Sequence, residues 1–367
     1  MITPWFPNDP DELTAEWLTG ALRASGAVRD AAVKGFTMEQ VGVGVGFVGH
    51  LTRFTLSYDR EEPGAPASLV GKFPSRTEGA RQVAMLFGLY EREARVYAGF
   101  SSRLGMPAPI CYFAGCDPDR ERYVVLLEDL CDGRFGDQVA GCTVEEAGKI
   151  IQRLAKFHAH WWNSAELGGL NWIPLATDLV SGGIAQAYAP TWPAFMERFG
   201  DRLSPAILKR GPGLGDELLE LLKTYEGRPL TLGHSDFRVD NIFFPRDGSG
   251  RDLVVVDWGS PLRSAFPVYD FIYFVAGGLP TEARRASEDD LLRLYHETLL
   301  ANGVTGVTLE QLLEDCRASL LYVFAIICVI AGGTLDIVNE RAVELFDTIF
   351  TRFLPALEDY DALGVLP

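Results

Sequence analysis

The hydrophobic and polar residues in the first third of the chain change periodicity several times. Apolar residues recur at helical spacing over residues 9–25, after an acidic start, and predict an amphipathic helix. Residues 33–73 alternate between apolar and polar positions and predict three strands. Residues 78–100 return to helical spacing, and two more strands are predicted at residues 110–114 and 123–127, on either side of a turn that contains proline. The pattern therefore predicts a small lobe of five strands with one long helix.

The rest of the chain is mostly helical in pattern. Helices are predicted at residues 144–162, 215–225, 289–301, 309–331 and 341–357. Because the pattern changes from sheet-rich to helix-rich near Glu128, we expect an N-terminal lobe of residues 1–127 and a helical C-terminal lobe of residues 128–367. Residues 318–335 carry no charge, but they lack the flanking positive charge and the aromatic belt of a membrane span. We expect a buried helix there.

Composition narrows the class of protein. The chain of 367 residues is 47% hydrophobic, enough for a sizeable core, and its formal net charge is -17. Nucleic-acid binding relies on clustered Lys and Arg, so this charge argues against a nucleic-acid partner. The six cysteines form no C-x-x-C pair, and the N-terminus lacks the basic and apolar regions of a secretory signal. We therefore expect free thiols, a cytoplasmic location and no membrane partner, while the oligomeric state stays open.

Two acidic residues and an amide residue in the second half of the chain have the side chains that phosphoryl transfer needs. Asp236 and Asn241 lie five positions apart, and Asp257 ends the apolar run that follows them. Transfer from a magnesium nucleotide needs a carboxylate to orient the attacking hydroxyl and oxygen ligands to hold the metal. We expect Asp236 to be the catalytic base and Asn241 and Asp257 to be the metal ligands. Arg238 is placed to neutralise charge on the transferring phosphoryl group, whereas His234 is expected to brace the loop.

A glycine-rich segment lies between the first two predicted strands. Gly44, Gly46 and Gly49 form the pattern G-x-G-x-x-G, which occurs both in dinucleotide-binding folds and in phosphate-covering loops. The residues after Gly49 alternate like a strand, whereas a dinucleotide site needs a helix at that point. A strand-loop-strand hairpin that covers phosphates fits better. A flexible hairpin without a ligand is the alternative that the pattern leaves open.

A lysine and a glutamate complete the candidate nucleotide site. Lys72 lies within a short predicted strand, which is the placement of the lysine that pairs with nucleotide phosphates in kinases. A helical glutamate holds such a lysine in position, and Glu93 is our first choice, with Glu91 second. Either glutamate could instead be surface charge. His158 is expected to pack in the core, and Asp270, at an apolar helix start, to have a structural role.

These motifs resemble those of the aminoglycoside phosphotransferase and choline kinase-like superfamily, in particular its ecdysteroid kinase-like and acyl-CoA-dehydrogenase-associated kinase branches. The resemblance extends over nearly the whole chain and rests on residues 44–49, Lys72, residues 93–97, residues 125–130, residues 154–158, residues 234–241, residues 256–258 and Asp270. It implies an α+β, protein-kinase-like fold of two lobes, with a five-stranded antiparallel sheet and one long helix in the N-lobe and a mostly helical C-lobe. It also implies that the backbone of Glu128 and Leu130 meets adenine. Relatives usually have glycine where this chain has Ser235, which could restrict the loop backbone.

The expected function is that of an ATP- and Mg²⁺-dependent kinase that transfers the γ-phosphoryl group to the hydroxyl of a small-molecule alcohol. The acceptor candidates are an aminoglycoside or other amino sugar, a sterol-like alcohol and a hydroxyacyl thioester, because fold alone does not choose among them. Two alternatives stay open. One is a nucleotide-binding pseudokinase that acts as a binding module, and the other is a dinucleotide-dependent oxidoreductase.

Overall fold

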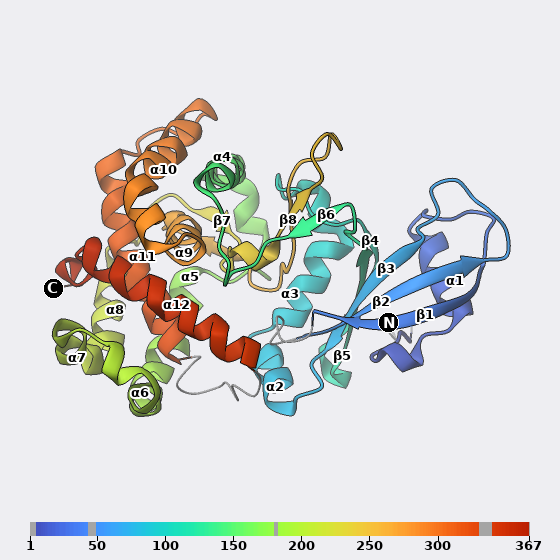
Figure 1. Ribbon diagram of the computed structural model, residues 1–367, viewed down its shortest axis with the longest axis horizontal. Helices are drawn as coiled ribbons and strands as arrows, with labels where there is room; N and C mark the ends of the chain where they lie inside the picture. The colour runs from blue at the N-terminus through green and yellow to red at the C-terminus, as the bar shows by residue number, and fades with distance from the viewer. Residues whose placement is uncertain (1–4, 43–48, 180–182, 330–339, 367) are drawn as a thin grey trace. The chain divides into compact units, whose positions relative to one another are not determined.

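The computed structural model describes residues 5–42, 49–179, 183–329 and 340–366, and the chain divides into two compact units (Figure 1). The first unit consists of Met1–Arg134 and Phe243–Ser260, and the second of Phe135–Ile242 and Pro261–Pro367. The short stretch Phe243–Ser260 therefore packs with the N-terminal part of the chain. The lobe boundary that the composition change predicts between residues 127 and 128 stays a prediction.

The first unit is built on a five-stranded antiparallel sheet in the order β1-β2-β3-β5-β4. The strands are β1 (Val33–Val41), β2 (Gly49–Tyr58), β3 (Ser68–Pro74), β4 (Cys111–Asp117) and β5 (Arg122–Glu128). All five strands predicted from the alternating pattern are present. Strand β3 is central, and its register places Lys72 opposite Leu51 of β2 and Val125 of β5.

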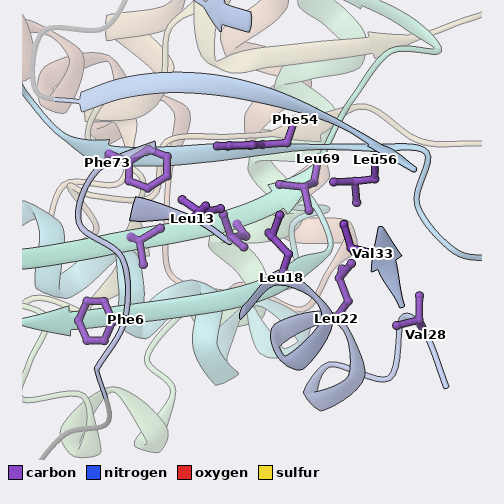
Figure 2. Close-up of a cluster of buried hydrophobic side chains, with 12 residues drawn as sticks. Phe6, Leu13, Leu18, Leu22, Val28, Val33, Phe54, Leu56, Leu69 and Phe73 are labelled. Atoms are coloured by element: carbon purple, nitrogen blue, oxygen red, sulfur yellow. The ribbon is translucent and has the colours of Figure 1, made fainter. Parts of the chain in front are cut away.

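Helix α1 (Ala15–Ala24) packs its apolar side against this sheet. Thr14 caps its first turn with a side-chain oxygen that accepts a backbone N–H. Leu18 and Leu22 of α1 are fully buried in one cluster with Phe54 of β2 (Figure 2). Burial of each such side chain stabilises the fold by about 1.5–3 kcal/mol. The helix predicted at the start of the chain therefore forms part of the core of the first unit.

The helix predicted over residues 78–100 is divided in the structure. It consists of α2 (Glu78–Leu86), α3 (Leu89–Arg95) and a π-helical turn at Val96–Phe100. Gly88, between α2 and α3, has a φ of 63°, a left-handed conformation that ends a helix and that glycine adopts without a steric penalty. The apolar spacing continues through Gly88, so periodicity alone did not reveal the break.

The second unit is mainly helical. Its helices are α4 (Val144–Trp161), α5 (Ala176–Leu179), α6 (Ala185–Phe199), α7 (Pro205–Arg210), α8 (Leu214–Lys223), α9 (Val268–Gly278), α10 (Thr281–Ala301), α11 (Leu309–Val329) and α12 (Glu340–Asp359). Strands β7 (Thr231–Gly233) and β10 (Leu262–Ser264) of this unit pair antiparallel. Strands β6 (Gly133–Phe135), β8 (Ile242–Pro245) and β9 (Val254–Val255) form a small sheet in the order β6-β8-β9, and most of its residues belong to the first unit. Helix α9 packs against α10, α11 and α12 (Figure 1). It is therefore a central element of this unit.

The sequence pattern missed α6 and α7 and began α10 too late in the chain. Helix α6 contains Pro190 and Pro193, which normally disfavour a helix interior. Arg284 lies in the first turns of α10, where its side chain is fully buried and pairs with Asp359. A buried arginine at this position breaks the apolar periodicity on which the helix prediction relied.

The uncharged stretch at residues 318–335 begins inside α11. Residues 320–325 are buried, as expected for a core helix, and the part from residue 330 onwards lies outside the described residues. Within the described ranges, no helix is both long and apolar enough to cross a bilayer. All six cysteines are free thiols.

Candidate active site

A buried ion-pair cluster in the first unit joins residues that are far apart in the sequence. The Lys72 ammonium group lies 2.8 Å from Glu93 Oε2 and 2.8 Å from Asp257 Oδ1. The Tyr123 hydroxyl donates a hydrogen bond to Glu93 Oε2 at 2.7 Å. The side chains of Lys72 and Glu93 are buried, whereas that of Asp257 is 30% exposed. Burial alone would lower the pKa of Lys72, but the two carboxylates raise it overall, so the lysine keeps its charge.

Close packing holds this cluster in place. Strand β3 carries Lys72 and helix α3 carries Glu93. A Cβ added at Gly49 would lie 2.8 Å from Lys72 Cε, so the lysine stem runs along the Gly49 backbone. Tyr90 of α3 stacks on Tyr123 of β5 with ring centroids 4.5 Å apart, and its hydroxyl accepts a backbone N–H from the segment after β3. These contacts fix α3, and with it Glu93, against the sheet.

Asp257 follows β9 in a backbone conformation that is uncommon for this residue type. Its φ is 64°, in the left-handed region, which costs a non-glycine residue about 1–2 kcal/mol. Two contacts beside it hold this turn. The buried Trp258 indole donates to the Val255 carbonyl at 3.0 Å, and the Arg92 guanidinium of α3 donates to the Gly259 carbonyl at 3.1 Å. The turn directs the Asp257 carboxylate to Lys72.

The other residues predicted for the nucleotide site in this unit have separate surroundings. Gly44 and Gly46 lie outside the described residues. Glu91, the second choice as partner for Lys72, instead pairs with Arg95 one turn later at 2.6 Å, on the exposed side of α3. The structure therefore brings Gly49, Lys72, Glu93 and Asp257 together but not Glu91.

Glu128 and Leu130 lie where β5 ends. The Glu128 N–H donates to the Ile110 carbonyl at 2.8 Å, and its carboxylate forms a two-pronged contact with the Arg251 guanidinium at 2.6 and 2.7 Å. Leu130 packs in a small apolar cluster with Phe243 and Val254. The Glu128 N–H and carboxylate are thus already engaged within the protein.

In the second unit, the loop after β7 gathers polar groups around Asp236. The Asn241 amide Nδ2 donates to Asp236 Oδ2 at 3.0 Å and to its backbone carbonyl at 2.9 Å. Arg238 Nε lies 3.4 Å from Asp236 Oδ1, while Arg238 Nη1 lies 3.1 Å from Asp240 Oδ2. The Tyr273 hydroxyl of α9 donates to Asp236 Oδ1 at 3.3 Å. Asp236 therefore has a hydrogen-bond donor at each carboxylate oxygen while its side chain stays 30% exposed.

Asp270 of α9 holds the backbone of the same loop. Its two carboxylate oxygens accept the N–H groups of His234 at 2.7 Å and Ser235 at 2.8 Å. His158 Nε2 lies 3.3 Å from the same carboxylate, so the expected core histidine is also part of this polar network. His234 Nδ1 accepts the Asp236 N–H at 3.3 Å, a local contact of the loop-bracing kind expected for it. Ser235 has a φ of 66°, a left-handed conformation that only glycine adopts without a steric penalty.

The side-chain amide of Asn241 is oriented so that its oxygen is available to bind a cation. Both hydrogen bonds of this side chain within the described residues are donated by Nδ2, to two acceptor atoms of Asp236. The nitrogen must face these acceptors, so the amide oxygen points elsewhere. Amide and carboxylate oxygens are the ligands that Mg²⁺ prefers. Asn241 and the partly exposed Asp257 thus each carry an oxygen of the type that Mg²⁺ prefers, and their role as metal ligands stays a prediction.

Sequence reasoning missed two tyrosines that contact the candidate residues. Tyr123 lies in the alternating pattern of β5 and Tyr273 in the apolar run of α9, and neither stands out from its neighbours. The only signal for Tyr273 is its position one helical turn after Asp270, which places both on one side of α9.

Comparison with known proteins gives a consistent picture of the family and fold. The model of the ecdysteroid kinase-like family matches residues 43–303. A search of curated protein sequences found no match. Similar solved structures include choline kinase from Cryptosporidium parvum Iowa II, with 12% identity, a TM-score of 0.59 and coverage of 96% of this chain and 98% of that chain. Ethanolamine kinase from Plasmodium vivax has 11% identity, a TM-score of 0.56 and coverage of 92% and 87%.

A third neighbour is the GDP complex of wild-type aminoglycoside 2′-phosphotransferase IIIa, with 14% identity, a TM-score of 0.51 and coverage of 91% and 97%. At these identities the likeness is one of fold. The predicted protein-kinase-like α+β fold of two lobes is confirmed.

Proposed function

The chain belongs to the ecdysteroid kinase-like family, and we propose on that premise that it is an ATP-dependent kinase for a small-molecule alcohol. One observation carries the proposal. Lys72 from a sheet strand is held by Glu93 from a helix and by Asp257 after a second strand. A lysine held by a helical glutamate, next to a metal-binding aspartate, is the arrangement that kinases use to bind nucleotide phosphates.

We assign the chemistry to the loop of the second unit. The acceptor oxygen forms a bond to the γ-phosphorus, the bond from that phosphorus to the bridging oxygen of ADP breaks, and the acceptor proton passes to Asp236. The products are ADP and a phosphate monoester. Because the transition state is loose, Asp236 mainly orients the hydroxyl and accepts its proton late. Arg238, which is largely buried beside Asp236, would neutralise charge on the transferring group.

The proposed cofactors follow from the donor atoms. Lys72 and the backbone at Gly49 would bind phosphate oxygens, and Asn241 and Asp257 would hold Mg²⁺. When bound, Mg²⁺ would neutralise negative charge on the phosphates. The GDP in one structural neighbour supports a nucleotide as the phosphoryl donor. For the glycine segment, Glu128 and Leu130, the proposed nucleotide contacts are those that the family resemblance implies.

The acceptor is proposed only by class. Aminoglycosides or amino sugars, sterol-like alcohols and hydroxyacyl thioesters all carry the hydroxyl that the reaction needs. Ethanolamine and choline kinases among the structural neighbours support a small-molecule hydroxyl. We propose a cytoplasmic enzyme without a nucleic-acid or membrane partner, consistent with the net charge of -17.

An ATP-consumption screen over these acceptor classes tests the proposal. We expect turnover with at least one class, dependent on Mg²⁺. Asp236→Ala should abolish turnover but leave the nucleotide Kd nearly unchanged. Asp247→Ala, which removes an exposed carboxylate from the hairpin between β8 and β9, should behave like the wild type. Equal activity of wild type and Asp236→Ala would contradict the assignment of the base.

Thermal unfolding with ligands separates the alternatives. A ligand that binds only the native state raises the melting temperature. Stabilisation by ATP and Mg²⁺ with turnover supports the kinase, and the same stabilisation without turnover across all acceptor classes indicates a pseudokinase. Stabilisation by NAD but not by ATP would indicate an oxidoreductase.

A further inference from the structure

The hydrogen bonds on Asp236 come from two different parts of the second unit. Asn241, which donates to Oδ2, and Arg238, whose Nε lies 3.4 Å from Oδ1, belong to the same loop as Asp236. Tyr273, which donates to Oδ1, belongs to helix α9. Asp236 and Tyr273 are 37 residues apart in the sequence. Tyr273 therefore ties the carboxylate to an element outside its own loop.

Helix α9 is held rigidly by its surroundings. Nearly all of its residues are buried, and it packs against α10, α11 and α12. The Tyr273 ring is held on two sides. It stacks on Phe353 of α12 with ring centroids 5.8 Å apart, and it lies 5.9 Å from Tyr269 one turn earlier on α9. The ring has little room to rotate, so its hydroxyl occupies a defined position.

The same helix also fixes the loop backbone. Asp270 accepts the N–H groups of His234 and Ser235, the two residues before Asp236. Asp270 and Tyr273 are three residues apart on α9 and thus lie on one side of the helix. The backbone contact sets where the loop runs, but it does not touch the Asp236 carboxylate. Asn241 and Arg238 contact that carboxylate from within the loop, and the Tyr273 hydroxyl adds a contact from outside the loop.

We propose that Tyr273 is a positioning residue that sets the orientation of the Asp236 carboxylate toward the acceptor hydroxyl. This proposal rests on the proposed function. Tyr273 and Arg238 contact Oδ1, and Asn241 contacts Oδ2, so the carboxylate plane is fixed and one lone pair can face the acceptor. The 3.3 Å distance is long for a hydroxyl donor, as catalytic contacts often are before substrate binds.

Kinetics of Tyr273→Phe test the proposal, because this change removes the hydroxyl and keeps the ring that packs on Phe353. With ATP, MgCl₂ and the best acceptor of the screen, we expect kcat to fall about tenfold, equivalent to about 1.4 kcal/mol in activation free energy. The nucleotide Kd and the KM for ATP should stay close to wild type, and the unfolding free energy should fall only by the roughly 0.5–1.5 kcal/mol that one hydrogen bond contributes. The control is Tyr269→Phe, since within the described residues the Tyr269 hydroxyl makes no hydrogen bond to Asp236. An unchanged kcat in Tyr273→Phe, or an equal loss in the control, would overturn the proposal.

A second measurement does not depend on turnover. Urea unfolding of Tyr273→Phe, Asp236→Asn and the double variant measures the coupling between the two side chains. We expect the two costs to be non-additive because they share one hydrogen bond. Additive costs would reject the contact even if the chain proves to be an active kinase. If no acceptor is found, the proposed function fails, but a measured coupling would still support the orientation of Asp236 by Tyr273.

Discussion

Replacing Lys72 with methionine tests how strongly the ion-pair cluster of the first unit is coupled. One oxygen of Glu93 and one oxygen of Asp257 each lie 2.8 Å from the ammonium group. At an effective dielectric constant of about 20, the attraction at that distance is about 6 kcal/mol per contact, but desolvation of the ions opposes most of it. Removing one member of a buried pair leaves the other uncompensated and costs about 3–5 kcal/mol. Because water compensates the partly exposed Asp257, the main cost falls on Glu93. We expect the free energy of unfolding to drop by about 3 kcal/mol.

Urea unfolding at neutral pH, followed by tryptophan fluorescence, measures this drop. The double variant Lys72→Met/Glu93→Gln should lose less than the sum of its two single variants, because the uncompensated carboxylate is then absent. Lys34→Met removes an exposed lysine of β1 and should change the unfolding free energy by less than about 0.5 kcal/mol. If Lys72→Met unfolds at the same urea concentration as the wild type, the cluster is not coupled and the reasoning is refuted.

Three further changes probe separate features. Burial lowers the pKa of His50 below its ordinary 6.5, so the native state binds fewer protons than the unfolded state, and stability should fall as the pH drops below about 6.5, by at most about 1.4 kcal/mol per pH unit. When unfolding is compared between about pH 5 and pH 7, the contribution of His50 to this pH dependence should be absent in His50→Gln. Ser235→Gly should raise the unfolding free energy by up to about 1 kcal/mol, because relief of the left-handed backbone outweighs the added entropy of glycine; lower stability in urea would contradict this. Gly49→Ala should weaken ATP binding in a calorimetric titration because its Cβ would displace Lys72, whereas Gly79→Ala, where a Cβ meets nothing within 4 Å, should not.

The sequence was most informative where a local pattern carries the signal. Alternation predicted the five strands because in a strand every second side chain faces the core. Helical periodicity failed at Gly88, where the apolar spacing continues through a break between two helices, and at α10, where a buried Arg284 occupies a position at which an apolar residue is expected. In both cases the deciding factor, a positive φ or an ion pair with a distant residue, has no periodic signature.

By itself, the sequence determined the residue types of the candidate site and their order: a lysine in a strand, a glutamate in a helix, and two acids with an amide near two short strands. Only the tertiary structure decided which of them meet. Lys72 and Asp257 are 185 residues apart, and Glu93 rather than Glu91 is the partner because α3 turns that side toward the sheet. The physical reason is that periodicity reports which side of an element is buried, whereas the partner of a buried charge depends on how separate elements pack together.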